Sequence, residues 1–235
     1  MVRSPKVKRM SSALAMPPLR RAVFLDRDGV LVDDRGFLLR AEQIRLLAGV
    51  PAALGRLKAA GMFLAAVSNQ AAVARGLLDE GRLAELNGLI VERIAALGGP
   101  RLDAVYCCPH HPQADLPEYR VACACRKPRP GMILRAAAEH GLDLGASFLV
   151  GDRMTDIAAG VAAGCRTVLV ACGRHDAPPI VTLDPIDPAC RPDHVCRDLE
   201  EASAWILAQV DNAKEREEGC SRVGQPGINA GPNTG

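Results

Sequence analysis

Two aspartates stand two residues apart where an apolar run ends. The stretch AVFLDRDG, residues 22–29, places Asp26 and Asp28 directly after four apolar residues that predict a buried strand. A carboxylate held at a strand end can attack phosphorus and form an acyl phosphate. A second carboxylate nearby can protonate the leaving group and then activate water. A DxD pattern alone is usually a solvated turn, so this chemistry requires partners elsewhere in the chain.

Donors and a cation that suit a phosphoryl group come later in the sequence. Ser68, Asn69 and Gln70 follow MFLAAV, residues 62–67, and offer one hydroxyl and two amides. Lys127, within CRKPRPG, offers a positive charge for phosphate oxygens. An SNQ tripeptide alone is typical of a loop, and it gains meaning only beside the other motifs.

A third carboxylate follows another apolar run. Asp152 ends the segment SFLVGD, and the motif GDRMTD adds Asp156 four residues later. Close carboxylates repel one another, and a divalent cation relieves that repulsion while it neutralises phosphate oxygens. Oxygen ligation of this kind suits Mg²⁺. We expect Asp156 to hold either Lys127 or a metal-bound water. The expected magnesium ligands are Asp26, Asp28 and Asp152.

Cysteines and histidines crowd into residues 107–129. Cys108-x-His110 is followed after twelve residues by Cys123-x-Cys125, and three thiolates with one imidazole suit a closed tetrahedral zinc site. Disulfides and inert thiols are the alternatives to a metal.

Two neighbours of this set leave the choice of zinc ligands open. Cys107 and His111 adjoin it and compete for ligation. Whichever ligands bind, a zinc ion on this loop would fix Arg126 and Lys127, which follow directly, against the phosphate site.

Alternating segments predict how these residues are positioned. The predicted strands are 22–25, 62–68, 104–107, 147–151 and 166–171. The predicted helices are 50–61, 77–97, 130–142, 155–164 and 198–210, the second with apolar residues at 83, 86, 90, 94 and 97. This order predicts an α/β fold with a doubly wound parallel sheet covered on both faces. Ligands bind outside the carboxyl ends of such strands, where the polar motifs fall.

Composition excludes several classes of protein. Of the 235 residues, 49% are hydrophobic, 24% charged and 3% aromatic, and the formal net charge is +2. Few aromatic residues and a low net charge argue against a nucleic-acid partner. No apolar stretch approaches the roughly 20 residues that span a bilayer, so no membrane partner is expected. The nine cysteines, clustered as for a metal, favour a reducing cytoplasm. No extra apolar face calls for a subunit, and we expect a monomer.

The chain is expected to form a single catalytic domain at residues 22–211. Residues 1–21 are basic, lack the apolar core of a signal peptide and are expected to be a disordered arm. Residues 173–197 are rich in Pro, Cys and Asp and are expected to be a long loop. Residues 212–235 are polar and rich in Gly and Pro and are expected to be a disordered tail.

The motifs DRDGV, SNQ and GDRMTD, together with Lys127, resemble those of the haloacid-dehalogenase (HAD) superfamily of aspartyl-phosphate phosphatases. The resemblance implies that Asp26 is the nucleophile and Asp28 the general acid and base, which also lends a backbone carbonyl to Mg²⁺. It implies that Ser68 and Lys127 hold the phosphoryl group and that Asp152 completes the magnesium site. Neither GxGxxG after a strand nor GxxxxGK[ST], the signatures of competing phosphate-binding folds, occurs.

The pattern CPHHPx₁₀CxCRKP, residues 108–128, is similar to heptose 1,7-bisphosphate 7-phosphatases and histidinol-phosphate phosphatases. By this resemblance the HAD-like core carries no large cap domain, a zinc-binding loop is present, and short loops bind the substrate. The implied zinc ligands are Cys108, His110, Cys123 and Cys125. The implied substrate-binding residues are Asp34, Arg35, Gly36, Phe37, Asn69, Gln70, Arg126 and Arg153.

Three functions compete on this evidence. The first is a Mg²⁺-dependent phosphatase that removes the 7-phosphate of a heptose 1,7-bisphosphate, a small phosphorylated sugar, because Arg126 and Arg153 favour a second phosphate. The second is hydrolysis of histidinol phosphate or another small phosphomonoester. The third is a catalytically silent zinc module, which would lack one of the motif residues, whereas all are present. The sequence departs from the family pattern at Ala71 and Ala72, where the family has Ser-Gly.

Overall fold

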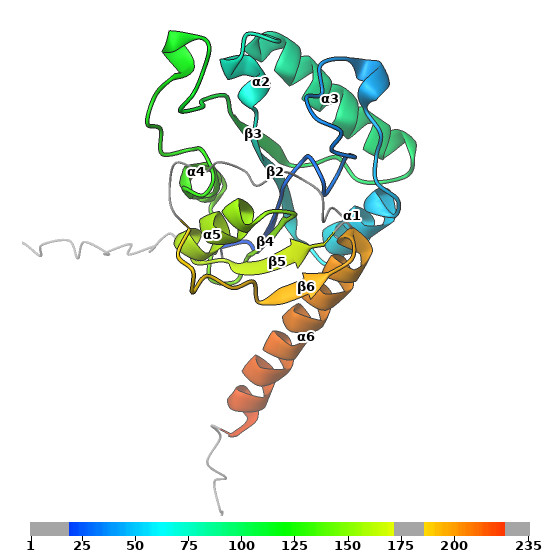
Figure 1. The fold of residues 1–235 in the computed structure, drawn as a ribbon. Coiled ribbons are helices and arrows are strands. Elements are labelled where there is room, and N and C mark those ends of the chain that lie inside the picture. The colour runs from blue at the N-terminus through cyan, green and yellow to red at the C-terminus, as the bar shows by residue number, and fades with distance from the viewer. Residues whose placement is uncertain (1–18, 172–185, 224–235) are drawn as a thin grey trace, which may run out of the picture.

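A six-stranded, all-parallel sheet forms the centre of the molecule. The computed structural model describes residues 19–171 and 186–223 (Figure 1). Neighbouring strands pair in the order β3-β2-β1-β4-β5-β6. Their bounds are β1 Ala22–Leu25, β2 Phe63–Asn69, β3 Ala104–Cys108, β4 Phe148–Gly151, β5 Arg166–Val170 and β6 His194–Cys196.

Helices cover both faces of this sheet, which confirms the predicted doubly wound α/β fold (Figure 1). One apolar cluster contains Leu54 of α1, Leu86 of α3 and Ile206 of α6, and the other contains Ile133 of α4 and Ala159 of α5. The helices are α1 Val50–Ala59, α2 Ala71–Ala74, α3 Glu80–Ala96, α4 Gly131–His140, α5 Met154–Ala163 and α6 Leu199–Val223, with 3₁₀ turns η1 Ala41–Gln43 and η2 Pro117–Tyr119.

The motif residues sit where the strands end. Asp26 follows β1, Ser68 and Asn69 close β2, and Asp152 follows β4. These three strands are neighbours, so their carboxyl ends meet at one edge of the sheet. The chain reverses its strand order between β1 and β4, which is the usual place for a ligand in this architecture. Within residues 19–171, the segment between β1 and α1 contains only the 3₁₀ turn η1 and the segment between β3 and α4 only η2, so neither holds a cap domain.

Several predicted boundaries are wrong. The predicted loop 173–197 contains β6, a three-residue strand too short to show a period in the sequence. Helix α6 continues to Val223 through the expected disordered tail, because AKEREE at 213–218 consists of strong helix formers. Arg20, expected in the disordered arm, exchanges backbone hydrogen bonds with Gly141 and Asp143. Residues 1–18, 172–185 and 224–235, where the other expectations about the arm, loop and tail fall, lie outside the described residues.

The predicted helix 77–97 is shorter than expected and its apolar face ends early. It begins after the N-cap Asp79, whose side chain accepts a hydrogen bond from the Arg82 backbone N–H. Leu97, assigned to the apolar face, follows the helix and is exposed. None of the described helices is long and apolar enough to cross a membrane.

Candidate active site at the carboxyl edge of the sheet

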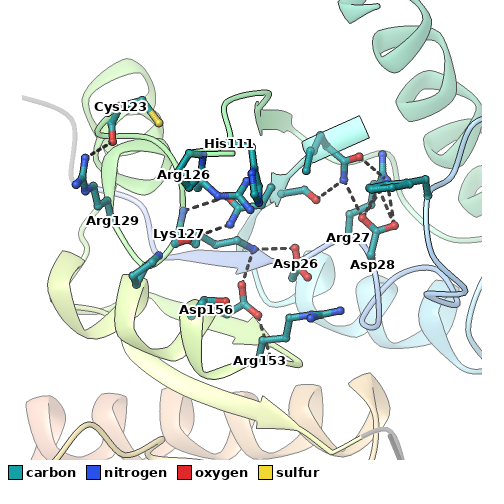
Figure 2. A pocket seen from close by; sticks show the side chains of 18 of the residues that line it. Asp26, Arg27, Asp28, His111, Cys123, Arg126, Lys127, Arg129, Arg153 and Asp156 are labelled. Carbon is teal, nitrogen blue, oxygen red and sulfur yellow. Dashed lines mark hydrogen bonds and ion pairs between the residues drawn. The ribbon is translucent and has the colours of Figure 1, made fainter. Parts of the chain in front are cut away.

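A buried ion cluster around Lys127 forms the floor of the site (Figure 2). The Lys127 ammonium donates to Asp26 Oδ1 at 2.7 Å and to the Val67 carbonyl at 2.7 Å, and lies 2.6 Å from Asp156 Oδ1. Burial disfavours the charged ammonium, but the carboxylates of Asp156 and Asp26 outweigh it and raise the pKa of Lys127. Lys127 therefore stays charged beside the expected nucleophile. Of the two roles open to Asp156, the structure shows the contact with Lys127.

Three carboxylates come together at this floor in a group that suits a divalent cation. One oxygen each of Asp26, Asp152 and Asp156 lies within 4.8 Å of the others. Their three negative charges and the one positive charge of Lys127 sum to −2, which a divalent cation balances. The carboxylate of Asp28 is not in this group.

The side chain of Asp152 is the clearest indication of a cation site. Its Oδ1 is buried and accepts no hydrogen bond from any residue that the structure describes. Burial, and then the charges of Asp26 and Asp156, raise the pKa of Asp152 to about 7. Gly29, at φ +88°, packs so closely that an added Cβ would lie 2.2 Å from Asp152 Oδ2. These donors fit Mg²⁺, which prefers oxygen ligands.

The carboxylate of Asp28 is enclosed by hydrogen-bond donors. Both of its oxygens accept from the Arg27 guanidinium at 2.9–3.2 Å, and Oδ2 also accepts from Gln70 Nε2 at 2.8 Å. Burial raises the pKa of Asp28, and the Arg27 charge opposes that effect. The same Gln70 nitrogen donates to Ser68 Oγ at 2.8 Å. Gln70 thus links two predicted catalytic side chains.

Asn69 is engaged with the protein chain. Its Nδ2 donates to the Lys127 carbonyl and its Oδ1 accepts from the Lys127 backbone N–H, both at 3.0 Å. The amides of Asn69 and Gln70 were expected to meet the substrate. Both residues line the cavity described below, but these bonds fix Lys127, Ser68 and Asp28.

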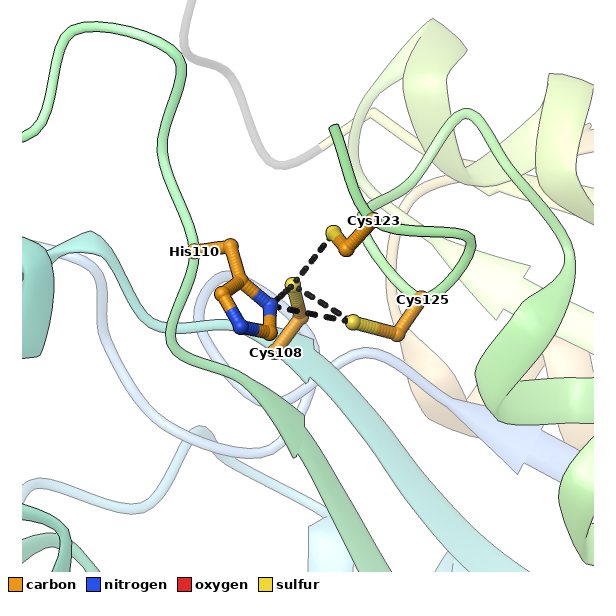
Figure 3. Close-up of side chains that lie close together, drawn as sticks. All are labelled: Cys108, His110, Cys123 and Cys125. Atoms are coloured by element: carbon orange, nitrogen blue, oxygen red, sulfur yellow. Dashed lines mark hydrogen bonds between the residues drawn. The ribbon is translucent and has the colours of Figure 1, made fainter. Parts of the chain in front are cut away.

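Three thiols and an imidazole form a compact cluster beside the site (Figure 3). Cys108 Sγ lies 3.0 Å from Cys125 Sγ and 3.6 Å from Cys123 Sγ, and His110 Nδ1 lies 3.6 Å from Cys108 Sγ and 3.4 Å from Cys125 Sγ. A tetrahedron of ligands about 2.3 Å from zinc has edges somewhat above these distances, so the donor set fits zinc. No disulfide joins any of the seven cysteines that the structure describes.

The two neighbours that compete for zinc ligation in the sequence are placed elsewhere. Cys107 Sγ accepts a hydrogen bond from Asn87 at 3.3 Å, and His111 Nδ1 accepts one from the Gln113 backbone N–H at 3.0 Å. The structure therefore brings together the four ligands implied by the resemblance.

A cavity of about 710 Å³ opens above Asp26, and its lining has more arginine and lysine than aspartate side chains. The sequence motifs identified Lys127, Arg126 and Arg153, and all three line it. The sequence analysis missed the other cationic side chains because isolated arginines in loops carry no spacing signal. These additional lining residues are Arg27, Arg75, Arg120 and Arg129.

The loop after β1 contributes one side of the cavity. Asp34 accepts a 2.8 Å hydrogen bond from Arg153, and Gly36 and Phe37 also line the cavity. Arg35 is exposed, pairs with Asp33 and is absent from the lining, in contrast to its predicted role in substrate binding. The chain bends at Arg35 and Gly36, where the Gly36 backbone N–H donates to Asp34 Oδ1, and the Arg35 guanidinium pairs with Asp33 instead of lining the cavity.

Comparisons with known proteins agree with this geometry. A family model described as HAD-hyrolase-like matches residues 124–202. The D-glycero-alpha-D-manno-heptose-1,7-bisphosphate 7-phosphatase of Burkholderia mallei is 43% identical over 162 residues, which cover 69% of this chain and 85% of that protein. The D-glycero-beta-D-manno-heptose-1,7-bisphosphate 7-phosphatase of Photorhabdus laumondii is 41% identical over 154 residues, covering 65% and 81%.

A solved structure shows the same arrangement of the chain. It is D,D-heptose 1,7-bisphosphate phosphatase from B. bronchiseptica complexed with magnesium and phosphate, with a TM-score of 0.64, 30% identity, and coverage of 80% of this chain and 99% of that one. The doubly wound sheet and its aspartate–lysine centre are those of a HAD-like hydrolase. Within that class, the chain belongs to the heptose-1,7-bisphosphate 7-phosphatase family, which confirms the resemblance seen in the sequence.

Proposed function

We propose that this protein removes the 7-phosphate of D-glycero-D-manno-heptose 1,7-bisphosphate through an aspartyl-phosphate intermediate. The observation that carries the proposal is Asp26 held 2.7 Å from the buried ammonium of Lys127, at the floor of a cationic cavity. A fixed carboxylate beside a fixed cation is what in-line attack on a phosphoryl group requires.

The first step transfers the phosphoryl group to the enzyme. An oxygen of Asp26 forms a bond to phosphorus while the bond between phosphorus and the sugar C7 oxygen breaks. Asp28 gives a proton to the departing oxygen, so the sugar leaves as an alcohol. Lys127 and Ser68 stabilise the charge on the phosphoryl oxygens during the transfer.

The second step restores the enzyme. A water oxygen forms a bond to phosphorus, and Asp28, now a carboxylate, takes the proton of that water. The bond between phosphorus and Asp26 breaks, inorganic phosphate leaves and the Asp26 carboxylate is regenerated. Atoms and charges balance over the two steps, and the overall reaction is hydrolysis of one phosphomonoester.

A magnesium ion would be held by Asp26, Asp152 and the backbone carbonyl of Asp28. Bound there, it would neutralise charge on the phosphoryl oxygens. The buried Oδ1 of Asp152, which accepts no hydrogen bond from the described residues, and the balance of charge at the floor support this site.

A zinc ion held by the four-residue cluster would act structurally. Cys125 directly precedes Arg126, whose Nη1 donates to the His110 carbonyl at 2.9 Å. One expected zinc ligand, Cys125, is therefore the sequence neighbour of Arg126, and another, His110, accepts its hydrogen bond. A closed zinc site would hold the Arg126 guanidinium at the cavity wall. Thiols grouped as for a metal require a reducing compartment, and we propose a cytoplasmic enzyme.

The cationic wall supports a bisphosphate over histidinol phosphate. Arg126 and Arg153 would bind the distal 1-phosphate, and further arginines surround the opening. Asp34, the acidic residue that would attract an amine, already pairs with Arg153. A positively charged amine would therefore meet a net positive wall. We propose that the enzyme acts as a monomer on this small sugar phosphate, with no nucleic-acid or membrane partner.

Phosphate release from three substrates tests the proposal. The assay compares the α and β anomers of the heptose 1,7-bisphosphate with histidinol phosphate, each with Mg²⁺. We expect kcat/KM for one heptose anomer to exceed that for histidinol phosphate by about a hundredfold, or about 2.7 kcal/mol of transition-state discrimination. The two relatives named above differ in anomer, so the assay also decides between the anomers. A preference for histidinol phosphate would refute the assigned substrate while leaving the mechanism standing.

A further inference from the structure

Arg27, the residue between the two motif aspartates, is buried rather than solvated. It is 2% exposed, although arginine is almost never buried unless it is paired. Its Nε and Nη2 both lie 2.9–3.2 Å from the two oxygens of Asp28 (Figure 2). The two planar groups form a bidentate pair, called the fork below. The fork fixes both the position and the rotation of the Asp28 carboxylate.

Two amides fix Arg27 in turn. Gln70 Oε1 accepts from Nη2 and Asn87 Oδ1 accepts from Nη1, each at 2.9 Å. Asn87 lies on the face of α3 that packs on the sheet. Its neighbours on that face, Leu86 and Ile90, are buried apolar residues. Asn87 Nδ2 then donates to Cys107 Sγ on β3 at 3.3 Å. A hydrogen-bonded chain therefore runs from β3 through α3 to the carboxylate of Asp28.

We infer that Asn87 and Arg27 are positioning residues that hold the Asp28 carboxylate in the orientation for proton transfer to the leaving group. Asn87 does not line the catalytic cavity, and of its two hydrogen-bond partners, Arg27 and Cys107, it is Arg27 that contacts Asp28. Proton transfer requires donor and acceptor within hydrogen-bond reach, and a displacement of about 1 Å can cost a hundredfold in rate. The inference rests on the proposed role of Asp28 as general acid.

The dependence of kcat/KM on the leaving group distinguishes a misplaced general acid from a general loss of active-site structure. The ester p-nitrophenyl phosphate releases an anion stabilised by its nitro group and needs little protonation, whereas phenyl phosphate releases a much more basic oxygen. Because kcat/KM reports steps only up to the release of the phenol, it isolates the step in which Asp28 donates its proton. The experiment measures kcat/KM for both esters, with Mg²⁺, in the full-length protein and its variants.

The main variant is Asn87→Ala, which removes the acceptor for Arg27 Nη1. We expect kcat/KM for phenyl phosphate to fall about 10- to 100-fold and that for p-nitrophenyl phosphate to fall less than about threefold. Arg27→Lys keeps the charge but not the planar fork, and it should show the same pattern with a larger loss for phenyl phosphate. If Arg27→Lys does not fold, Asn87→Ala decides the question.

The matched control is Leu86→Ala, one residue away on the same helix. Leu86 is fully buried in the core and belongs to no part of the hydrogen-bonded chain, so its loss should lower Tm while the ratio of the two kcat/KM values stays at the wild-type level. An Asn87→Ala enzyme that loses activity equally on both esters, or on neither, would overturn the inference. Neither ester contains a sugar, so failure of the proposed heptose substrate would appear only in the three-substrate assay.

Discussion

The Asp152 carboxylate should destabilise the protein whenever magnesium is absent. The pKa of this group rises from 3.8 to about 7 in the folded protein, first through burial and then through Asp26 and Asp156. A carboxyl group with a raised pKa contributes stability below its unfolded pKa, and that stability is lost as the pH rises through the folded pKa. The magnesium-free protein should therefore lose stability between about pH 4 and pH 7 on account of Asp152.

The size of the effect follows from the pKa change. At about 1.4 kcal/mol for each pH unit, a rise from 3.8 to about 7 corresponds to about 4 kcal/mol. Asp152→Asn has the same shape and cannot ionise. Without magnesium, the variant should be more stable than the wild type by about 2–4 kcal/mol at pH 8, and the difference should shrink toward zero near pH 4.

Urea unfolding at a series of pH values measures this difference. Magnesium should be removed by gel filtration without a chelator, so that the thiol and imidazole cluster keeps any metal it holds. Saturating Mg²⁺ should raise the free energy of unfolding of the wild type and have little effect on Asp152→Asn. A variant no more stable than the wild type at pH 8 would show that Arg153, whose Nε lies 3.8 Å away, already compensates the charge, and the cation-site argument would lose its support.

Three further predictions concern the other groups of the site. Asp26→Asn should abolish phosphate release while circular dichroism shows a folded protein, and retention of even a few per cent of wild-type activity would count against a covalent mechanism. Cys123→Ser should lose bound zinc, measured by elemental analysis, and lower Tm by about 5 °C or more; unchanged zinc content and melting would refute a structural metal. Arg153→Ala should raise KM for the bisphosphate about 10- to 100-fold and leave p-nitrophenyl phosphate unaffected, since only the bisphosphate presents a distal phosphate; equal losses on both would argue against that contact.

Motifs at strand ends were predictable because elementary topology brings them together. Parallel strands share one edge, so Asp26, Ser68 and Asp152 could be placed side by side before any coordinates were known. The place of the thiol and imidazole cluster was predictable for a similar reason, since all of its candidate ligands occur within residues 107–125, but spacing left Cys107 and His111 open and the set of four followed from the resemblance. In both cases local spacing or strand order carries the information.

The supporting residues could not be predicted in this way. Asn87 interrupts an otherwise apolar helix face by a single polar residue, and nothing local indicates that its partner lies 60 residues away. Arg27 lies in the sequence DRDG, which is typical of a solvated turn. Only the tertiary packing of the protein buries its side chain. Strand β6 has three residues, which is too few for an alternating pattern to be distinguished from a loop.

The thiol and imidazole cluster also has a consequence for the conformational entropy of the chain. Cys108 and Cys125 are 17 positions apart, and a zinc ion joining them would close a loop about as long as one that a disulfide restrains by about 3 kcal/mol. Arg120 and Arg126 lie within or next to that loop and line the cavity. These two arginines would then lose their conformational entropy when the protein folds. Substrate binding would not have to supply that entropy cost in each catalytic cycle.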